Sequence, residues 1–214
     1  MRTPMPLRIF PIISPVVFTM IVIVLGNITP GYNQFNYTIS RLAIEKYGWI
    51  QSLNFLQLAA GLYLTGIRLT ALIKDKAADK IIRTTFIIGS SLLVIAAFVP
   101  TYPIENVPLD YTLLTPTGLV HISVVILFLL VSPFGIMQLT QVLKKEPLFS
   151  QYARYTMIAG FAALVGSVVW FVFYFLGMYL EYRGIFQKGI ALPVLLWLIL
   201  INHAILRKLR TAPS

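Results

Sequence analysis

The chain has 214 residues, of which 58% are hydrophobic and only 11% are charged, and its mean hydropathy is +0.83. A soluble domain carries about 25% charged residues, so this composition excludes an ordinary soluble domain and indicates that lipid surrounds most of the chain. The absence of cysteine excludes disulfide bonds, thiolate metal sites and cysteine nucleophiles. The net charge of +10 does not indicate nucleic acid binding, because the basic residues gather at the ends of apolar runs, as membrane orientation requires.

The first apolar run, residues 7–26, is predicted to be a membrane helix that the protein retains. It follows Arg2 and Arg8, and a cleaved signal peptide has the same order of basic and apolar residues. The run is long, however, Pro11 and Pro15 interrupt it, and no small-x-small cleavage site follows it. We therefore expect a membrane helix here.

A polar connection over residues 27–48 follows the first run. Within it, apolar or aromatic residues recur at helical spacing and precede a glycine that is suited to ending a turn: Ile39, Leu42, Ala43, Tyr47 and Gly48. This pattern predicts a short amphipathic helix that lies in the membrane interface.

The second apolar run, residues 49–73, carries a polar stripe. At about 100° per residue, an arc of about 80° on this helix collects five residues, while its other faces are apolar. These five are Asn54, Gln57, Gly61, Thr65 and Arg68. Because polar groups in a membrane are costly when they face lipid, we expect this stripe to face other helices of the protein.

Four further apolar runs complete a predicted all-α bundle of six membrane helices that forms a single domain over residues 1–214. These runs cover about residues 81–99, 117–142, 156–180 and 188–206. The helix over 117–142 is predicted to kink at Pro133.

Six crossings place both termini on one side of the membrane, and the distribution of charge indicates which side. Short cytoplasmic loops carry an excess of Lys and Arg. Most of the 17 basic residues lie beside the termini or on loops that share their side, and the exceptions are Arg41, Lys46, Arg183 and Lys188. The sequence therefore predicts a multi-pass protein of the cell membrane with both termini in the cytoplasm.

A candidate ligand site lies near the outer ends of the second and fourth predicted helices. At a rise of about 1.5 Å per residue, Asn54, Gln57 and His121 are expected to share one layer beneath the outer loops. The layer and the segments around it supply the candidate ligand-binding residues, all polar or charged: Ser40, Arg41, Asn54, Gln57, Glu105, Asp110, Thr117 and His121. A polar pocket that opens outward and simple hydrogen bonding between helices explain this pattern equally well.

No enzyme chemistry is specified by these residues. A zinc hydrolase needs three protein ligands, and only His121 lies at a suitable depth. Ser40 and His121 with an acid could form a hydrolytic triad, yet nothing marks Ser40 as a strained nucleophile. His203 is predicted at the opposite end of the bundle, which excludes a haem held by two histidines. No phosphate loop or dinucleotide motif is present, so no catalytic residue, metal site or cofactor is predicted.

Several phrases of the sequence are shared with a known family. They are Gly31-Tyr32, Thr38-Ile-Ser-Arg-Leu-Ala43, Gly48-Trp49, Asn54-Phe55, Gly61, Pro100-Thr101 and Thr117-Gly118 leading to His121. With these phrases, most of the chain resembles the six-helix prokaryotic membrane family catalogued as domain of unknown function 998. That family typically has an aspartate after its Phe-Pro-Thr phrase and an acid beside its Ile-Ser phrase, where this chain has Tyr102 and Arg41. The resemblance implies six helices and an outward-facing polar cluster, and it implies no particular activity, substrate or cofactor.

Three functions stay open at this point, and all of them have the lipid bilayer as a partner and none has nucleic acid. The first, which we favour, is binding of a small or lipid-like ligand in an outward polar pocket between the second and fourth helices, as in a transporter component. The second is an intramembrane hydrolase that uses His121 with Ser40 or a loop acid. The third is a structural or partner-binding protein whose polar stripes only hold its helices together.

Overall fold

The computed structural model describes residues 5–99, 101 and 115–211, and six long α-helices account for most of them. These are α1 (Met5–Ile28), α2 (Gly48–Leu72), α3 (Lys76–Phe98), α4 (Pro116–Lys145), α5 (Ser150–Phe175) and α6 (Arg183–Thr211). Two short 3₁₀ helices, η1 (Ile39–Ile44) and η3 (Leu180–Tyr182), lie in the connections. The described residues contain no strand. All six long helices are apolar and long enough to cross a membrane, which confirms the predicted all-α architecture.

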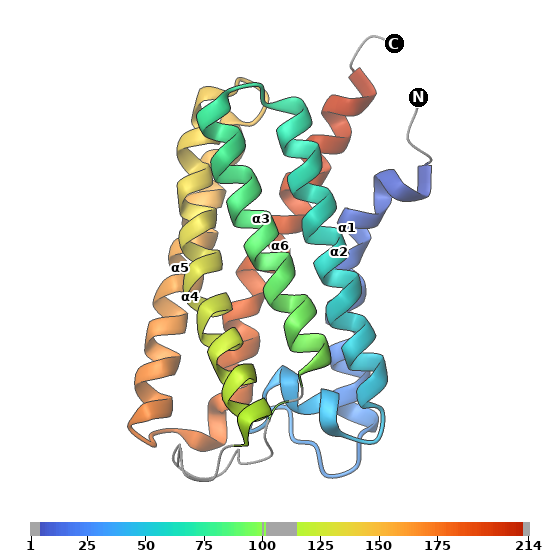
Figure 1. Cartoon of the computed structure of the whole chain (residues 1–214), viewed down its shortest axis with the longest axis vertical. Coiled ribbons are helices and arrows are strands. Elements are labelled where there is room, and N and C mark those ends of the chain that lie inside the picture. Colours follow the sequence, from blue (N-terminus) through green and yellow to red (C-terminus); the bar gives the residue numbers. More distant parts are fainter. Residues whose placement is uncertain (1–4, 100, 102–114, 212–214) are drawn as a thin grey trace.

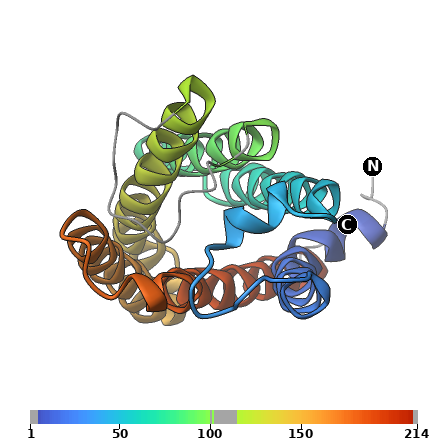
Figure 2. The same ribbon diagram turned by 90° about the horizontal axis from the view of Figure 1, so that it is seen from below.

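The six helices stand in chain order and close into a ring, which Figure 2 shows end on. Each helix packs against the next one along the chain, and α1 packs against α6. Neighbouring helices run in opposite directions (Figure 1), as short connections require. We call the end where α2, α4 and α6 begin the η1 end, and the opposite end, where α1 begins and α6 ends, the terminal end. Both described ends of the chain therefore lie on one side, and the cytoplasmic location of that side stays a prediction.

Capping residues explain where two of the helices begin, ahead of their predicted starts. The carboxylate of Asp75 accepts a hydrogen bond of 2.7 Å from the backbone N–H of Ala78 at the start of α3. The hydroxyl of Thr115 accepts one of 3.1 Å from the N–H of Gly118 at the start of α4. Short polar side chains at this position satisfy N–H groups that have no partner within the helix, so each helix begins at its cap and not at its first apolar residue.

Helix α5 ends at Phe175, before the predicted end of the fifth span at 180. Gly177 has a φ of 66° and Tyr179 a φ of 52°, a left-handed conformation that stops an α-helix. The N–H of Met178 then donates to the carbonyl of Phe173 over 2.8 Å, which closes the helix end. The connection between α5 and α6 thus comes earlier in the chain than the apolar pattern predicted.

The connection between α1 and α2 folds back over the η1 end of the ring. Lys188 on α6 donates hydrogen bonds to the carbonyls of Gln34 and Tyr37 over 2.8 and 2.9 Å. The N–H of Ile39 donates to Oε1 of Gln187 over 2.7 Å. Figure 2 shows η1 inside the outline of the ring, between α2 and α6. The connection is therefore held on α6, and η1 covers part of the interior of the bundle.

The short helix predicted in this connection is a 3₁₀ helix, η1, and its Ile39 and Leu42 are buried. Gly48 does not end this helix, as the sequence suggested, but begins α2. A Cβ at Gly48 would collide with the carbonyl of Ala43. The glycine is therefore explained by the close approach of two backbone segments.

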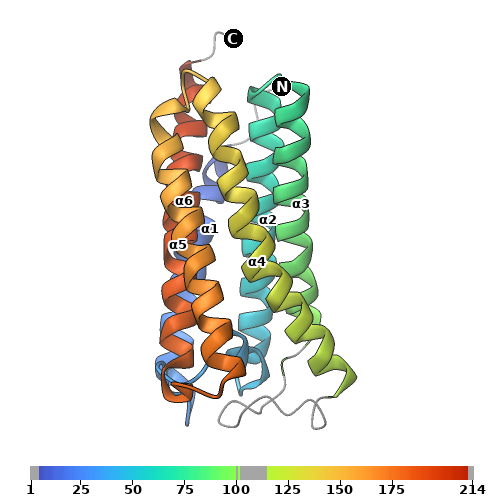
Figure 3. The same cartoon turned by 90° about the vertical axis from the view of Figure 1, so that its left-hand side faces the viewer.

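Helix α4 packs differently on the two sides of Pro133. After this proline, residues such as Ile136 and Leu139 belong to the main hydrophobic core. Before it, Leu129 and Val124 belong to two smaller hydrophobic clusters. Figure 3 shows α4 inclined across the bundle, beside α5 near the terminal end and towards α3 at the η1 end. The half of α4 near the η1 end thus contributes no buried residue to the main core and contacts it through the partly buried Phe128.

We expect Gly184→Ala to destabilise the protein, because a Cβ at this position would collide with the carbonyls of Tyr37 and Gln34 in the connection between α1 and α2. Overpacking of this kind costs about 1–3 kcal/mol. Gly189→Ala is the matched control on the same helix, since no atom lies within 4 Å of its Cβ position. Thermal unfolding in detergent should show a lower midpoint for Gly184→Ala alone, and equal midpoints would contradict this packing.

The orientation can be tested with single cysteines, because the chain has none of its own. Ala77 is exposed at the terminal end and Glu181 is exposed at the η1 end. On intact cells, a membrane-impermeant maleimide should label Glu181→Cys and leave Ala77→Cys unlabelled until the cells are lysed. The reverse labelling would overturn the predicted cytoplasmic termini.

Candidate functional site

The polar stripe of α2 lies against α1 and donates hydrogen bonds to its backbone. The side-chain amide of Asn54 donates to the carbonyl of Phe18 over 3.1 Å, and that of Gln57 donates to the carbonyl of Ser14 over 3.1 Å. The hydroxyl of Ser14 returns a hydrogen bond of 3.2 Å to the carbonyl of Gln57. As expected, the stripe faces protein, and both amides are committed to holding α1 and α2 together.

Arg68 completes this contact where a proline interrupts α1. Pro11 has no N–H to donate to the carbonyl of Leu7, four residues earlier. The guanidinium of Arg68 donates to that carbonyl and, over 2.9 Å, to the carbonyl of Arg8. In a membrane no water replaces a missing backbone hydrogen bond, so Arg68 satisfies a group that the proline leaves free.

Thr65, on the same stripe, lies further along α2 and contacts α6 instead. Its hydroxyl is 2.9 Å from the side-chain nitrogen of Asn202, and both residues are fully buried. The stripe therefore forms hydrogen bonds to two helices, α1 and α6. Its polar groups meet the requirement for internal hydrogen bonding inside a membrane.

His121 is buried in the second turn of α4 and bonds to the end of α3. Its Nδ1 lies 2.6 Å from the carbonyl of Val99, and since a carbonyl only accepts, Nδ1–H is the donor. Nε2 has no hydrogen-bond partner among the described residues. Within the same part of the chain, no three His, Asp or Glu side chains come together as a metal site would require.

The other predicted site residues are spread over the η1 end. Thr117 is exposed in the first turn of α4. Arg41 forms an ion pair of 2.6 Å with Glu45, while Ser40 is buried and lines a cavity inside the ring. Two predicted residues, Glu105 and Asp110, lie outside the described residues.

The structure does not gather the predicted site residues that it describes around one space. Asn54 and Gln57 bond to α1, whereas His121 bonds to the end of α3. Only Ser40 among them lines the cavity. Ligand binding by each of these residues stays a prediction.

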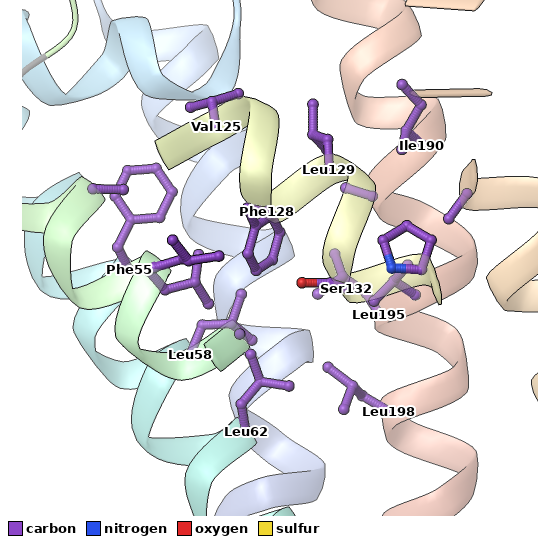
Figure 4. Close-up of a pocket in the computed structure, with 18 of the residues that line it drawn as sticks. Phe55, Leu58, Leu62, Val125, Phe128, Leu129, Ser132, Ile190, Leu195 and Leu198 are labelled. Carbon is purple, nitrogen blue, oxygen red and sulfur yellow. The ribbon is translucent and has the colours of Figure 1, made fainter. Parts of the chain in front are cut away.

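The cavity lies in the middle of the ring and holds about 120 Å³. A single water needs about 10–15 Å³ on this measure, so the space is large enough for a group much bigger than water. Apolar side chains, mainly from α2, α3, α4 and α6, form most of its wall, and several of those from α2, α4 and α6 are labelled in Figure 4. Small residues leave room at Gly89 and Ala163, and a Cβ at Gly89 would meet only Oγ of Ser132 within 4 Å.

Hydrogen-bonding side chains are few in this wall, and none of its lining residues in the described part of the chain is charged. The hydroxyl or amide groups come from Ser40, Thr85, Ser132 and Gln187. Ser40 and Gln187 lie at the η1 end, where the amide of Gln187 already accepts from Ile39. The cavity therefore suits an apolar molecule with a few uncharged polar groups.

The sequence does not reveal this cavity, because its lining residues are of the same types that fill the core of a helix bundle. The one feature of the sequence that points to it is a polar residue, Ser132, directly before Pro133 in the fourth apolar run. Only the packing of all six helices shows that the residues around Ser132 leave space between them.

Comparison with known proteins identifies one family. The family described as "Protein of unknown function (DUF998)" matches residues 12–203, a range that includes the cavity wall and at least part of every long helix. No curated protein and no solved structure gives a significant match to the chain.

We expect the double variant Asn54→Leu with Gln57→Leu to fold but to lose stability, because two hydrogen bonds between α1 and α2 disappear. Hydrogen bonds between membrane helices contribute about 0.6 kcal/mol each, so the free energy of unfolding should fall by about 1 kcal/mol. Asn27→Leu is the control, because Asn27 is exposed and bonds only within α1. Denaturation in mixed micelles measures the difference, and unchanged stability would contradict the structural role of both amides.

Proposed function

The chain belongs to the DUF998 family, and we propose that this multi-pass membrane protein binds a lipid-like molecule whose apolar body occupies the central cavity. The observation that carries the proposal is the cavity itself: it lies inside the membrane-spanning bundle, is walled mainly by apolar side chains, and has no charged residue among its described lining residues. A cavity of this kind binds hydrocarbon more readily than water.

The energetic reason for binding is packing. Lipid chains are about as apolar as leucine side chains, so moving hydrocarbon from the bilayer into the cavity gains little by the hydrophobic effect. Each atom that lines an empty space, however, lacks partners on one side and loses dispersion energy. A chain that fits between α2, α4 and α6 restores those contacts. Shape, more than apolarity alone, would decide which molecule binds.

The proposal modifies the site predicted from the sequence. That site was polar and lay between the second and fourth helices, whereas the cavity is apolar and reaches α3, α5 and α6 as well. In the proposal, Ser40 contacts the ligand at the η1 end, while Asn54 and Gln57 hold α1 in place. Contacts of the ligand with Arg41, Thr117 and His121 stay predictions.

The test fills the cavity with a larger side chain. Ala191 lines the cavity on α6, and its neighbour Leu192 is half exposed on the outer surface. In native mass spectrometry of protein extracted from membranes, the wild type and Leu192→Phe should retain a hydrocarbon-containing molecule. Ala191→Phe should retain much less, because its ring occupies the same space.

The thermal midpoint of Ala191→Phe shows whether this variant is folded, and a filled cavity should leave that midpoint unchanged or higher. A wild type without any bound molecule, or a folded Ala191→Phe with undiminished occupancy, would argue against the proposed function.

A further inference from the structure

Ser132 has a hydroxyl for which the fold provides no partner. Its Oγ is buried and makes no hydrogen bond to any described residue. The residue lines the cavity, and Figure 4 shows its oxygen pointing into that space. A buried hydroxyl without a partner is uncommon in folded proteins and calls for a specific explanation.

Thr140 on α4 also has a buried hydroxyl without a partner, but it does not line the cavity. Two other buried serines of the helices behave differently from Ser132. The hydroxyl of Ser167 donates to the carbonyl of Ala163 over 2.7 Å, and that of Ser90 donates to the carbonyl of Ile87 over 3.0 Å. A hydroxyl of a serine within a helix usually donates in this way to a carbonyl of the preceding turn. Ser132 makes no such bond, so the hydrogen-bonding capacity of its hydroxyl is unused among the described residues.

Pro133 leaves a second polar group in the same place. Because proline has no N–H, the carbonyl of Leu129 loses its regular helix donor. The corresponding carbonyl in α1, that of Leu7, is satisfied by Arg68. No side chain in the described part of the chain donates to Leu129, and both Leu129 and Pro133 line the cavity.

We infer that the cavity selects a long-chain ligand that carries an uncharged hydroxyl group, and that Ser132 binds this group. The inference rests on the proposed function and specifies the class of its ligand. A hydroxyl can both accept a hydrogen bond from the hydroxyl of Ser132 and donate one to it, so it pairs with Ser132 in either orientation. A charged group does not fit, because no described residue of the wall carries a charge that would neutralise it and burying an unpaired charge is very costly.

The position of Ser132 along α4 restricts the class of ligand further. Ser132 follows Pro116, the first residue of α4, by about 24 Å of helix, which places it near the middle of this long helix. A phospholipid keeps its headgroup at the membrane surface and would bring only hydrocarbon to this level. The ligand is therefore a neutral lipid alcohol that can lie within the bilayer.

The experiment compares probes of one chain length in the full-length protein in lipid nanodiscs: 1-tetradecanol, tetradecane and myristate. Dissociation constants are measured by competition with radiolabelled 1-tetradecanol for the alcohol and myristate, and by direct titration for the alkane. The wild type should bind the alcohol about tenfold more tightly than the alkane, as one to two net hydrogen bonds predict. Myristate, which is charged, should bind more weakly than the alcohol.

Ser132→Ala should weaken binding of 1-tetradecanol about three- to tenfold and leave binding of tetradecane unchanged. Ser167→Ala is the matched control, because Ser167 is buried and bonds only within α5, and it should change neither value. Should Ser132→Ala fail to fold, the wild-type preference for the alcohol still decides the inference.

Two outcomes would overturn the inference and leave the proposed function standing. One is equal affinity of the wild type for alcohol and alkane, and the other is an equal loss for both probes in Ser132→Ala. If none of the three probes binds the wild type, both the inference and the proposed function fail.

Discussion

Prolines inside membrane helices impose the constraint on which this structure depends most. Each of them leaves one backbone carbonyl without its helix donor, and the bilayer offers no water as a substitute. In α1 another helix of the protein supplies the missing donor, since Arg68 of α2 donates to the carbonyl that Pro11 leaves free. In α4 the corresponding carbonyl is that of Leu129, which lines the cavity and receives no side-chain hydrogen bond from the described residues. The same local chemistry therefore holds two helices together at one place and leaves a carbonyl without its regular donor beside a cavity at another.

The arrangement of the helices explains why the cavity lies where it does. Six helices in a ring contact their neighbours well but leave the axis to be filled by side chains alone, and α4 divides at Pro133. Its second half joins the main core, whereas the buried residues of its first half belong to two small clusters and Phe128 alone of this half packs against the main core. Small residues such as Gly89 and Ala163 then face the middle. The cavity thus follows from the change in packing of α4 at Pro133 and from small side chains at one level of the bundle.

The sequence predicted the helices well because the length of an apolar run and the charges at its ends can be read directly from the local sequence. It also predicted that the stripe of Asn54, Gln57 and Arg68 faces protein. It could not show that the acceptors are backbone carbonyls of α1, since main-chain acceptors leave no trace in a side-chain pattern. The helix ends were displaced for a similar reason: the cap at Asp75 and the left-handed turn at Gly177 are set by single residues outside the apolar runs.

The connection between α1 and α2 forms part of the cavity wall and is also held on α6. Ile39 and Ser40 form part of the cavity wall, and the backbone of Ile39 is bonded to Gln187, another lining residue. The neighbouring Lys188 holds the preceding loop. A molecule that contacts Ser40 and Gln187 would stabilise the state in which this connection is docked, because a ligand that binds only the folded arrangement shifts the equilibrium towards it. Occupancy of the cavity and order at the η1 end are therefore thermodynamically linked, so that a weakened connection should also weaken binding.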